Sequence, residues 1–332
     1  MATVLSQPTA ADAALPATQP SIQVDQVTHR YGDRVALENL SFSVNRGEIF
    51  GLLGPNGSGK TTLFRILSTL MMPSSGRCNI AGHDVATEPQ RVRGNIGIVF
   101  QAKSVDIKLT VAENLRHQGH LYGLHGSALQ ARIKEILQRV ALSDRANDRV
   151  ETLSGGMQRR VELAKGLIHH PAVLLLDEPS TGLDPGARLD LWQYLRMLRD
   201  EEGVSILVTT HLMEEADKCD RLAILSTGKL VALGTPAELK SQIGGDVILL
   251  ESPDAPALAD RITQRFGVTP TVVGNSVRIE REGGHRFVTE IVESFPGTVT
   301  SLSVSKPSLE DVFISRTGHR FWTEKENTGV KA

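Results

Sequence analysis

The chain alternates between short apolar runs and longer segments whose apolar residues recur at helical spacing. Apolar runs stand at residues 49–53, 96–100, 172–176 and 205–208, and helix-like segments separate them. Such runs are typical of parallel strands buried on both faces, and the longer segments are typical of amphipathic helices. The pattern predicts an α/β fold with a mainly parallel sheet, whose strands present their carboxyl ends at one edge.

Two blocks depart from this alternation. Residues 22–44 alternate apolar and polar positions, as antiparallel strands with one wet face do. Residues 108–151 are helical in pattern and more polar, and Thr110 followed by Glu113 has the spacing of a capping box. We therefore expect an N-terminal antiparallel β subdomain, and a helical subdomain inserted at about residues 105–165.

The C-terminal part has the character of a separate small domain. Residues 246–314 read as strand, helix, strand, strand, helix and strand, and they contain no catalytic constellation. Residues 1–21 predict a disordered leader, and the polar tail 318–332 is expected to fray. The predicted domains are a core at 22–240 and a small α+β accessory domain at 246–315.

A glycine-rich loop lies between the first buried strand and the helix after it. Its glycines let successive backbone N–H groups turn inward around a polyphosphate, which the helix N-terminus also attracts. Lys60 is placed to reach the β- and γ-phosphates, and the Thr61 hydroxyl to bind Mg²⁺. In this context the pattern favours a P-loop NTPase core over an ordinary glycine turn, and it predicts nucleoside triphosphate binding. The loop comprises Gly54, Pro55, Asn56, Gly57, Ser58, Gly59, Lys60, Thr61 and Thr62.

Polar residues follow the other buried runs. Asp177 and Glu178 are adjacent at a strand end, so their side chains point to different places. Asp177 can hold Mg²⁺, and Glu178 can face the water that attacks the γ-phosphate. Gln101 could place its amide oxygen on Mg²⁺ or on that water, or be a simple strand-terminal amide. His211 could bind the γ-phosphate, although a lone histidine at a strand end is more often structural.

Two other positions leave alternatives open. Tyr31 could stack on an adenine ring, although a lone tyrosine in a turn more often only packs. Ser154 is a candidate N-cap, and the glycines after it, Gly155 and Gly156, leave the start of the next helix open. That helix start is either a second anion site or an ordinary cap.

Composition and charge narrow the classes of function. The 332 residues include 36 Lys+Arg against 38 Asp+Glu and only 4% aromatics, so no nucleic-acid partner is expected. No stretch approaches the ~18–20 continuous apolar residues of a membrane span, and the N-terminus lacks the pattern of a secretory signal. Any membrane function would then need a separate chain. Cys78 and Cys219 are expected to be free thiols in a reducing compartment.

Taken together, these motifs resemble the ATP-binding subunits of ABC transporters over about residues 22–238. The departure at residues 181–184, Thr-Gly-Leu-Asp where many relatives have Ser-Ala-Leu-Asp, keeps the aspartate. The resemblance implies that Mg²⁺ is bound near Thr61, Gln101 and Asp177. It further assigns adenine stacking to Tyr31, the loop glutamine to Gln101, the signature sequence to Leu153, Ser154, Gly155, Gly156 and Gln158, the catalytic base to Glu178, the D-loop aspartate to Asp184 and the switch histidine to His211.

The family implies ATP and Mg²⁺ as cofactors and a head-to-tail homodimer in the ATP-bound state. In that dimer the signature of one subunit contacts the γ-phosphate held by the other. The resemblance also implies a separate transmembrane permease, contacted around residues 101–111, and a peripheral place on the cytoplasmic face of the inner or plasma membrane. Residues 306–314 look like the ending of ATPases that serve drug, antibiotic, lipid or polysaccharide exporters, including the daunorubicin-resistance type.

The leading hypothesis is the ATPase subunit of an exporter, and three alternatives remain. An importer ATPase is opposed only by the C-terminal module. A non-transport ATPase of translation, repair or mechanical signalling usually carries two fused cores or a long coiled coil, and this sequence has one phosphate loop and no long heptad tract. A binding module that has lost catalysis is disfavoured by the intact Lys60, Asp177, Glu178 and His211.

Overall fold

The computed structural model describes residues 19–321, so residues 1–18 of the expected leader and 322–332 of the expected tail lie outside the described part. The chain divides into two compact units, the first made of residues up to 221 with 227–229, the second of 222–226 and the residues from 230 onward. This division falls near the strands β9 (Arg221–Ser226) and β10 (Lys229–Gly234). The domain boundary at 240–246 stays a prediction.

Parallel strands form the centre of the first unit. They pair in the order β3 (Ile49–Leu53), β8 (Ser205–Thr210), β7 (Val173–Asp177) and β6 (Ile96–Val99). Every residue of β3, β7 and β8 is buried, as their unbroken apolar runs require. Leu53 pairs with Thr210, and Asp177 pairs with Thr209. The polar residues that follow these strands therefore start from the same edge of the sheet.

The predicted antiparallel subdomain forms a second sheet in the first unit. Its strands lie in the order β2 (Arg34–Val44), β1 (Ile22–Tyr31), β4 (Ser75–Ile80) and β5 (His83–Asp84). The helix α1 (Lys60–Leu67) contacts β2 and β4, and the helix α2 (Pro89–Asn95) contacts β5. Phe42 of β2 stacks on Phe50 of β3, with ring centroids 5.2 Å apart. This apolar contact joins the antiparallel sheet to the parallel one.

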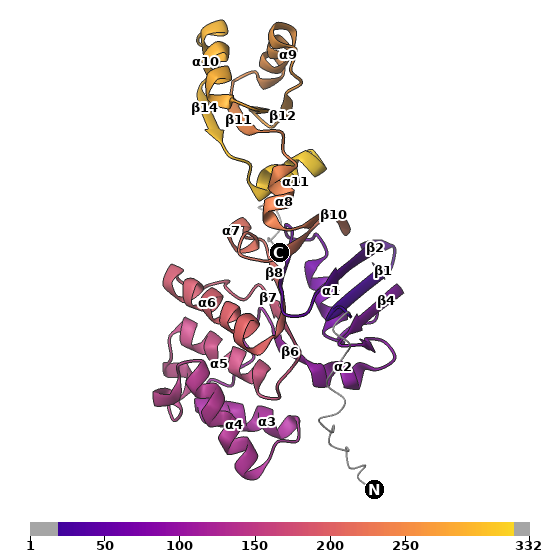
Figure 1. Cartoon of the computed structure of the whole chain (residues 1–332), viewed down its shortest axis with the longest axis vertical. Coiled ribbons are helices and arrows are strands. Elements are labelled where there is room, and N and C mark those ends of the chain that lie inside the picture. The colour runs from indigo at the N-terminus through magenta and orange to yellow at the C-terminus, as the bar shows by residue number, and fades with distance from the viewer. Residues whose placement is uncertain (1–18, 322–332) are drawn as a thin grey trace, which may run out of the picture. The chain divides into compact units, whose positions relative to one another are not determined.

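The helical part of the unit lies beside β6 and β7 (Figure 1). Thr110 and Glu113 form the expected capping box at the start of α3. One apolar core joins these helices to the sheet, and Gly97 of β6 meets Gly166 so closely that a Cβ at position 97 would lie 2.3 Å from the Gly166 carbonyl oxygen. The elements are α3 (Val111–Leu121), α4 (Gly126–Arg139), the 3₁₀ turns Ser143–Arg145 and Val150–Thr152, α5 (Gly155–Leu167) and α6 (Pro185–Glu202). The short α7 (Met213–Ala216) lies instead against β3 and β8.

The second unit contains an antiparallel sheet with the order β12-β13-β11-β14. Its apolar core is formed by the sheet together with α9 and α10, as the predicted strand and helix order requires. The helix α11 was not predicted from the sequence; Ser308 caps it, again in a capping box. The elements are α8 (Pro236–Ser241), β11 (Asp246–Glu251), α9 (Ala255–Phe266), β12 (Thr271–Val273), β13 (Ser276–Arg281), α10 (Gly284–Ser294), β14 (Ser301–Ser305) and α11 (Leu309–Thr317).

Candidate active site

The phosphate loop connects β3 to α1. Gly54 follows β3 and donates its N–H to the Thr210 carbonyl, which anchors the loop to the neighbouring strand. Gly59 has a φ of 104°, and a Cβ there would lie 2.8 Å from the Ala36 carbonyl oxygen, so only glycine fits. The Lys60 side chain is buried and curls back over the loop, donating to the carbonyls of Gly54 (2.7 Å) and Pro55 (3.2 Å). The ammonium group is thereby held at the mouth of the loop.

The two adjacent acids do point apart. Asp177 is buried at the end of β7, and its Oδ1 accepts the Thr209 hydroxyl at 2.6 Å. Burial raises the pKa of Asp177 and the nearby Glu178 charge adds to this, whereas the bond from Thr209 opposes it. Glu178 has a φ of 45°, a left-handed conformation that is strained for this residue type. This turn swings the Glu178 carboxylate out of the strand's pleat.

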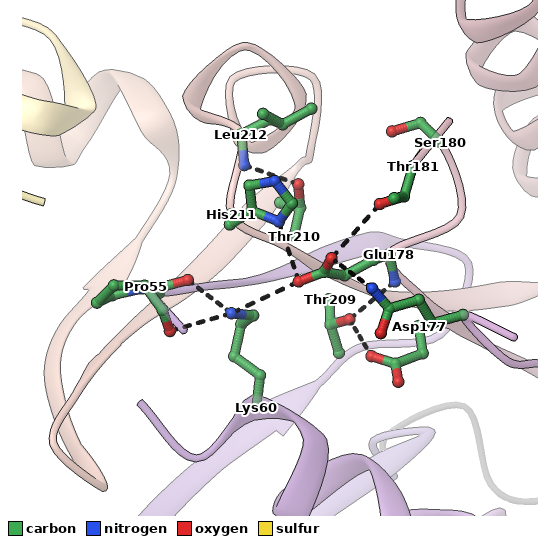
Figure 2. A network of polar contacts seen from close by, with 12 residues as sticks. Pro55, Lys60, Asp177, Glu178, Ser180, Thr181, Thr209, Thr210, His211 and Leu212 are labelled. Atoms are coloured by element: carbon green, nitrogen blue, oxygen red, sulfur yellow. Dashed lines mark hydrogen bonds and ion pairs between the residues drawn. The ribbon is translucent and has the colours of Figure 1, made fainter. Parts of the chain in front are cut away.

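The Glu178 carboxylate is the meeting point of the predicted catalytic residues. Figure 2 shows the side chains of Lys60 and His211 both reaching the same oxygen of this carboxylate. The distances are 3.7 Å from Lys60 Nζ and 3.0 Å from His211 Nδ1 to Glu178 Oε1. Gln101 donates its amide N–H to Glu178 Oε2 at 3.2 Å, and Thr181 donates its hydroxyl to the same oxygen at 3.4 Å. Three loops that are far apart in the sequence thus bring their side chains to one carboxylate.

Two hydroxyls of β8 support this cluster, and the sequence interpretation missed both. The Thr209 hydroxyl donates to the Asp177 carboxylate and accepts the backbone N–H of Glu178 at 3.0 Å (Figure 2). One side chain therefore helps to fix the positions of both acids. The Thr210 hydroxyl accepts the N–H of Leu212 (3.0 Å), next to His211. The sequence did contain a signal for these hydroxyls, because two threonines stand together where a buried apolar run ends.

Glu215 is a third missed residue, and it connects two loops of the cluster. It is 1% exposed. Its Oε2 accepts the Thr210 hydroxyl at 2.7 Å, and its Oε1 accepts the Ser180 hydroxyl. Ser180 lies two positions after Glu178, and Thr210 precedes His211. Glu215 therefore fixes the loop of the acid relative to the loop of the histidine.

The remaining predicted residues lie on other elements. Ser154 caps α5 by accepting the Met157 N–H at 3.3 Å, while Gln158 donates to the carbonyls of Val150 and Leu153. Asp184 caps α6 in the same manner, accepting the Ala187 N–H. The ordinary-cap interpretation thus holds for Ser154 within one chain. A Cβ at Gly155 would meet nothing within 4 Å, so the start of α5 is open to an approaching group.

Tyr31 stands at the end of β1, and the residue is 44% exposed. Its hydroxyl contacts the Met71 sulfur at 3.4 Å, and its ring meets His29 edge-on with centroids 4.8 Å apart. The contacts with Met71 and His29 hold the Tyr31 side chain in place, and much of the residue stays exposed to solvent. The tyrosine is therefore available to stack on another ring.

Comparisons with known proteins agree with this geometry. Residues 37–181 match the family model described as ABC transporter, and residues 234–317 match the model of the C-terminal domain of ATP-binding proteins like DrrA1-3. The daunorubicin resistance ATP-binding protein DrrA3 of Streptomyces coeruleorubidus is 40% identical over 312 residues, covering 90% of this chain and 96% of that one. The chain belongs to the ATP-binding proteins of ABC transporters. The predicted family and the predicted ATPase class are confirmed.

Other relatives and solved structures extend the match. The Nod factor export ATP-binding protein I of Ralstonia nicotianae is 43% identical, covering 72% of this chain and 75% of its own. The structure of an ATP-binding subunit of an ABC transporter matches with a TM-score of 0.60 at 30% identity, covering 67% of this chain and 92% of its own. The dimeric structure of an ATP-binding cassette in a post-hydrolysis state, bound to ADP and Pi, matches with a TM-score of 0.58 at 29% identity. The match covers 64% of this chain and 98% of that one. The predicted P-loop NTPase fold is confirmed.

Two surveys of the described residues bear on cofactors and membranes. None of the helices within residues 19–321 combines the length and the apolarity that crossing a bilayer demands. That same part of the chain contains no group of three or more His, Cys, Asp or Glu side chains able to hold a metal by themselves. Mg²⁺ commonly binds through only one or two protein ligands together with substrate phosphates, so Asp177 and Thr61 fit such an ion.

Proposed function

We propose that the chain hydrolyses MgATP at sites shared between two copies of itself and thereby powers export through a separate permease. The observation that carries the proposal is the Glu178 carboxylate, only 11% exposed and contacted at once by Lys60, Gln101 and His211. A general base needs such partial shielding together with hydrogen-bonding partners at the reacting group. Glu178 would orient and deprotonate the attacking water, and His211 would hold the γ-phosphate side of the site.

Nucleotide binding would rearrange one contact of this cluster. Lys60 is 3.7 Å from Glu178, and a γ-phosphate that approached the phosphate loop would compete with that carboxylate for the ammonium group. The loop from Gly54 to Thr62 would bind the phosphates, and Tyr31 would stack on the adenine. Mg²⁺, which would neutralise phosphate charge, would be held by Thr61, Asp177 and Gln101.

The signature sequence supplies the case for a two-copy site. Leu153, Ser154, Gly155, Gly156 and Gln158 surround the open start of α5, where backbone N–H groups attract an anion. We infer that they contact ATP held by the partner subunit, with Asp184 nearby in the D-loop. The dimeric solved cassette supports this arrangement.

The proposed partner and location follow from the family and its relatives. A permease made of separate chains would hold the homodimer on the cytoplasmic face of the membrane, and no nucleic acid is expected to take part. Export is favoured over import because the second unit matches the DrrA-type domain and the relatives include resistance and Nod factor export proteins. A drug-like, lipid or polysaccharide cargo is consistent with those names.

Glu178→Gln tests the catalytic proposal. The amide keeps the size of the side chain but cannot accept a proton, so steady-state phosphate release should fall by about a hundredfold or more. ATP should still bind, and size-exclusion chromatography with light scattering should show an ATP-dependent dimer. Glu214→Gln is the matched control, because Glu214 is exposed and lies on the nearby α7. Undiminished hydrolysis by Glu178→Gln would refute the assignment.

Direction of transport needs the complete transporter. The permease that co-purifies with the chain can be reconstituted with it into vesicles whose ATP-binding subunits face outward. Export from the cytoplasmic side predicts ATP-dependent accumulation of cargo inside these vesicles, and Glu178→Gln should abolish it. ATP-dependent loss of preloaded cargo would favour the importer alternative.

A further inference from the structure

The loop that carries Gln101 is fastened along one face of α5. The face consists of Gln158, Arg159, Glu162 and Lys165, whose spacing places them side by side on the helix. Lys103 Nζ donates to Gln158 Oε1 (2.6 Å), and Lys165 Nζ donates to the Ser104 carbonyl (2.5 Å). Both contacts are exposed, and they flank a buried centre.

That centre is an ion pair between Arg159 and Glu162. Arg159 Nη1 lies 2.6 Å from Glu162 Oε2, and the two side chains are 9% and 2% exposed. Glu162 Oε1 accepts the Ser104 N–H at 2.7 Å. Arg159 also donates to two backbone carbonyls, through Nη1 to Phe100 at 2.9 Å and through Nε to Pro179 at 2.8 Å.

The two carbonyls explain why this pair matters for the reaction. Phe100 immediately precedes Gln101, and Pro179 immediately follows Glu178. Gln101 and Glu178 are themselves in contact at 3.2 Å. One guanidinium on the signature helix thus holds both chain segments whose side chains meet at the proposed γ-phosphate site.

We propose that the Arg159–Glu162 pair is a positioning element that keeps Gln101 and Glu178 in fixed register with α5. The inference rests on the proposed function and deepens it, because the start of α5 is the signature that would contact the partner's ATP. A displacement of Gln101 would move α5 with it, so the two ATP sites of a dimer would sense one another through this pair. Because Arg159 and Glu162 belong to neither the phosphate loop nor the signature, we expect neither side chain to touch the nucleotide.

The competing explanation is that the pair only stabilises α5. A buried ion pair is a poor device for that purpose, because removing two charges from water costs about as much as their attraction returns. The planar guanidinium supplies several donors in fixed directions, and here it serves two carbonyls and a carboxylate at once. The geometry therefore favours positioning over simple helix stabilisation.

Two variants of the full-length chain test the inference. Arg159→Lys keeps the charge opposite Glu162, so the fold should persist, but one ammonium group cannot reproduce the planar fork. The double variant Arg159→Met with Glu162→Leu removes both charges together and leaves no unpaired buried ion. Both should bind a fluorescent ATP analogue within about twofold of wild type, since the phosphate loop is untouched.

For both variants the expected kinetic result is a fall in kcat without a matching rise in KM. We expect kcat to drop on the order of tenfold for Arg159→Lys and up to a hundredfold for the double variant, as misplacement of catalytic groups by about 1 Å can cause. The matched control is Arg160→Met with Asp190→Leu, which removes a more exposed ion pair between α5 and α6. Its kcat should equal that of wild type.

The outcomes separate this inference from the proposed function. If wild type releases phosphate and folded Arg159→Lys does so at the same rate, the positioning role is refuted and the proposed function stands. A fall in kcat that is matched by a lower melting temperature and lost ATP binding would show a structural role and also refute it. If wild type itself hydrolyses no ATP, the proposed function fails first.

Discussion

The two units of the chain bury polar groups for different purposes. In the first unit, buried polar side chains gather where the parallel strands end, and they connect loops that are distant in the sequence, as Thr209 and Glu215 do. In the second unit, the buried Arg278 contacts Asp311 and Glu280, and Asp311 completes the capping box of α11. The first arrangement holds the Glu178 carboxylate where the proposed reaction would need it, whereas the second secures a helix to a sheet.

Backbone conformation repeats this difference. Among the described residues of the second unit, every positive φ falls on a glycine, so its turns are unstrained. The part of the first unit that the structure describes includes eight non-glycine residues with positive φ, and Glu178 is one of them. Backbone strain of this kind persists only where surrounding contacts impose it, and here the Thr209 hydroxyl holds the Glu178 N–H. The proposed active site and the strained backbone positions thus lie in the same unit.

The largest contrast is expected from removing one lysine in each unit. Lys60→Met removes the buried cation of the phosphate loop, so kcat/KM should fall on the order of 10²–10³-fold. Lys306→Met removes an exposed lysine that pairs with Asp246, and hydrolysis should not change. A phosphate-release assay measures both. Equal losses would show that the second unit takes part in catalysis.

The next contrast compares two buried acids. Glu215→Ala releases the loops of Glu178 and His211 from one another, so kcat should fall about tenfold while KM stays near wild type. Asp311→Ala leaves Arg278 with one acidic partner fewer and breaks the α11 cap, so the second unit should lose roughly 1–3 kcal/mol of stability with hydrolysis intact. Kinetics and urea unfolding separate the two. A kinetic defect in Asp311→Ala would break the comparison.

Acid should weaken the first unit through His169. Burial, with help from the positive charges of His170 and Arg132, lowers the pKa of His169 to about 4, while its ring stacks on Tyr122 and its Nε2 faces the Ile96 carbonyl at 3.0 Å. The unfolded chain takes up this proton first, so the stabilisation is complete above the ordinary pKa and is lost as the pH falls towards 4. The full difference between the two pKa values corresponds to about 3 kcal/mol in the free energy of unfolding.

His169→Phe is the test of this pH dependence. The phenyl ring retains the stack but cannot titrate, so the slope of stability against pH should flatten between the ordinary pKa and about 4. Urea unfolding at several pH values, followed by the fluorescence of the buried Trp192 with Trp322 replaced, reports on the first unit. An unchanged slope would show that His169 does not dominate acid sensitivity.

The smallest expected effect is the reactivity of the two thiols. Both cysteines lie in the first unit and are buried; burial raises the pKa of Cys78 to about 12 and also raises that of Cys219. A thiol-specific reagent at mild pH should label neither in the native chain and both in denaturant. Labelling rates therefore report opening of the first unit alone. Rapid native labelling would contradict the burial.

The sequence predicted what depends on short motifs and periodicity. The phosphate loop, the two acids and the order in which strands and helices follow one another along residues 246–305 each depend on contiguous segments with their own pattern. Thr209 and Glu215 were missed because their importance comes from the register between β7 and β8 and from a turn of chain that only the fold brings close. Arg159 and Glu162 look like the charged face of an ordinary helix, and only packing shows that they are buried.

The contact between Gly97 and Gly166 sets limits on how this protein can diverge. Because a Cβ at position 97 would collide with the Gly166 carbonyl oxygen, the spacing between β6 and α5 admits no side chain at position 97. In a random library selected for transport, Gly97 should therefore be depleted of substitutions, although it belongs to neither the phosphate loop nor the signature, whereas alanine at Gly166, whose Cβ would meet its nearest neighbour at 3.5 Å, should be tolerated.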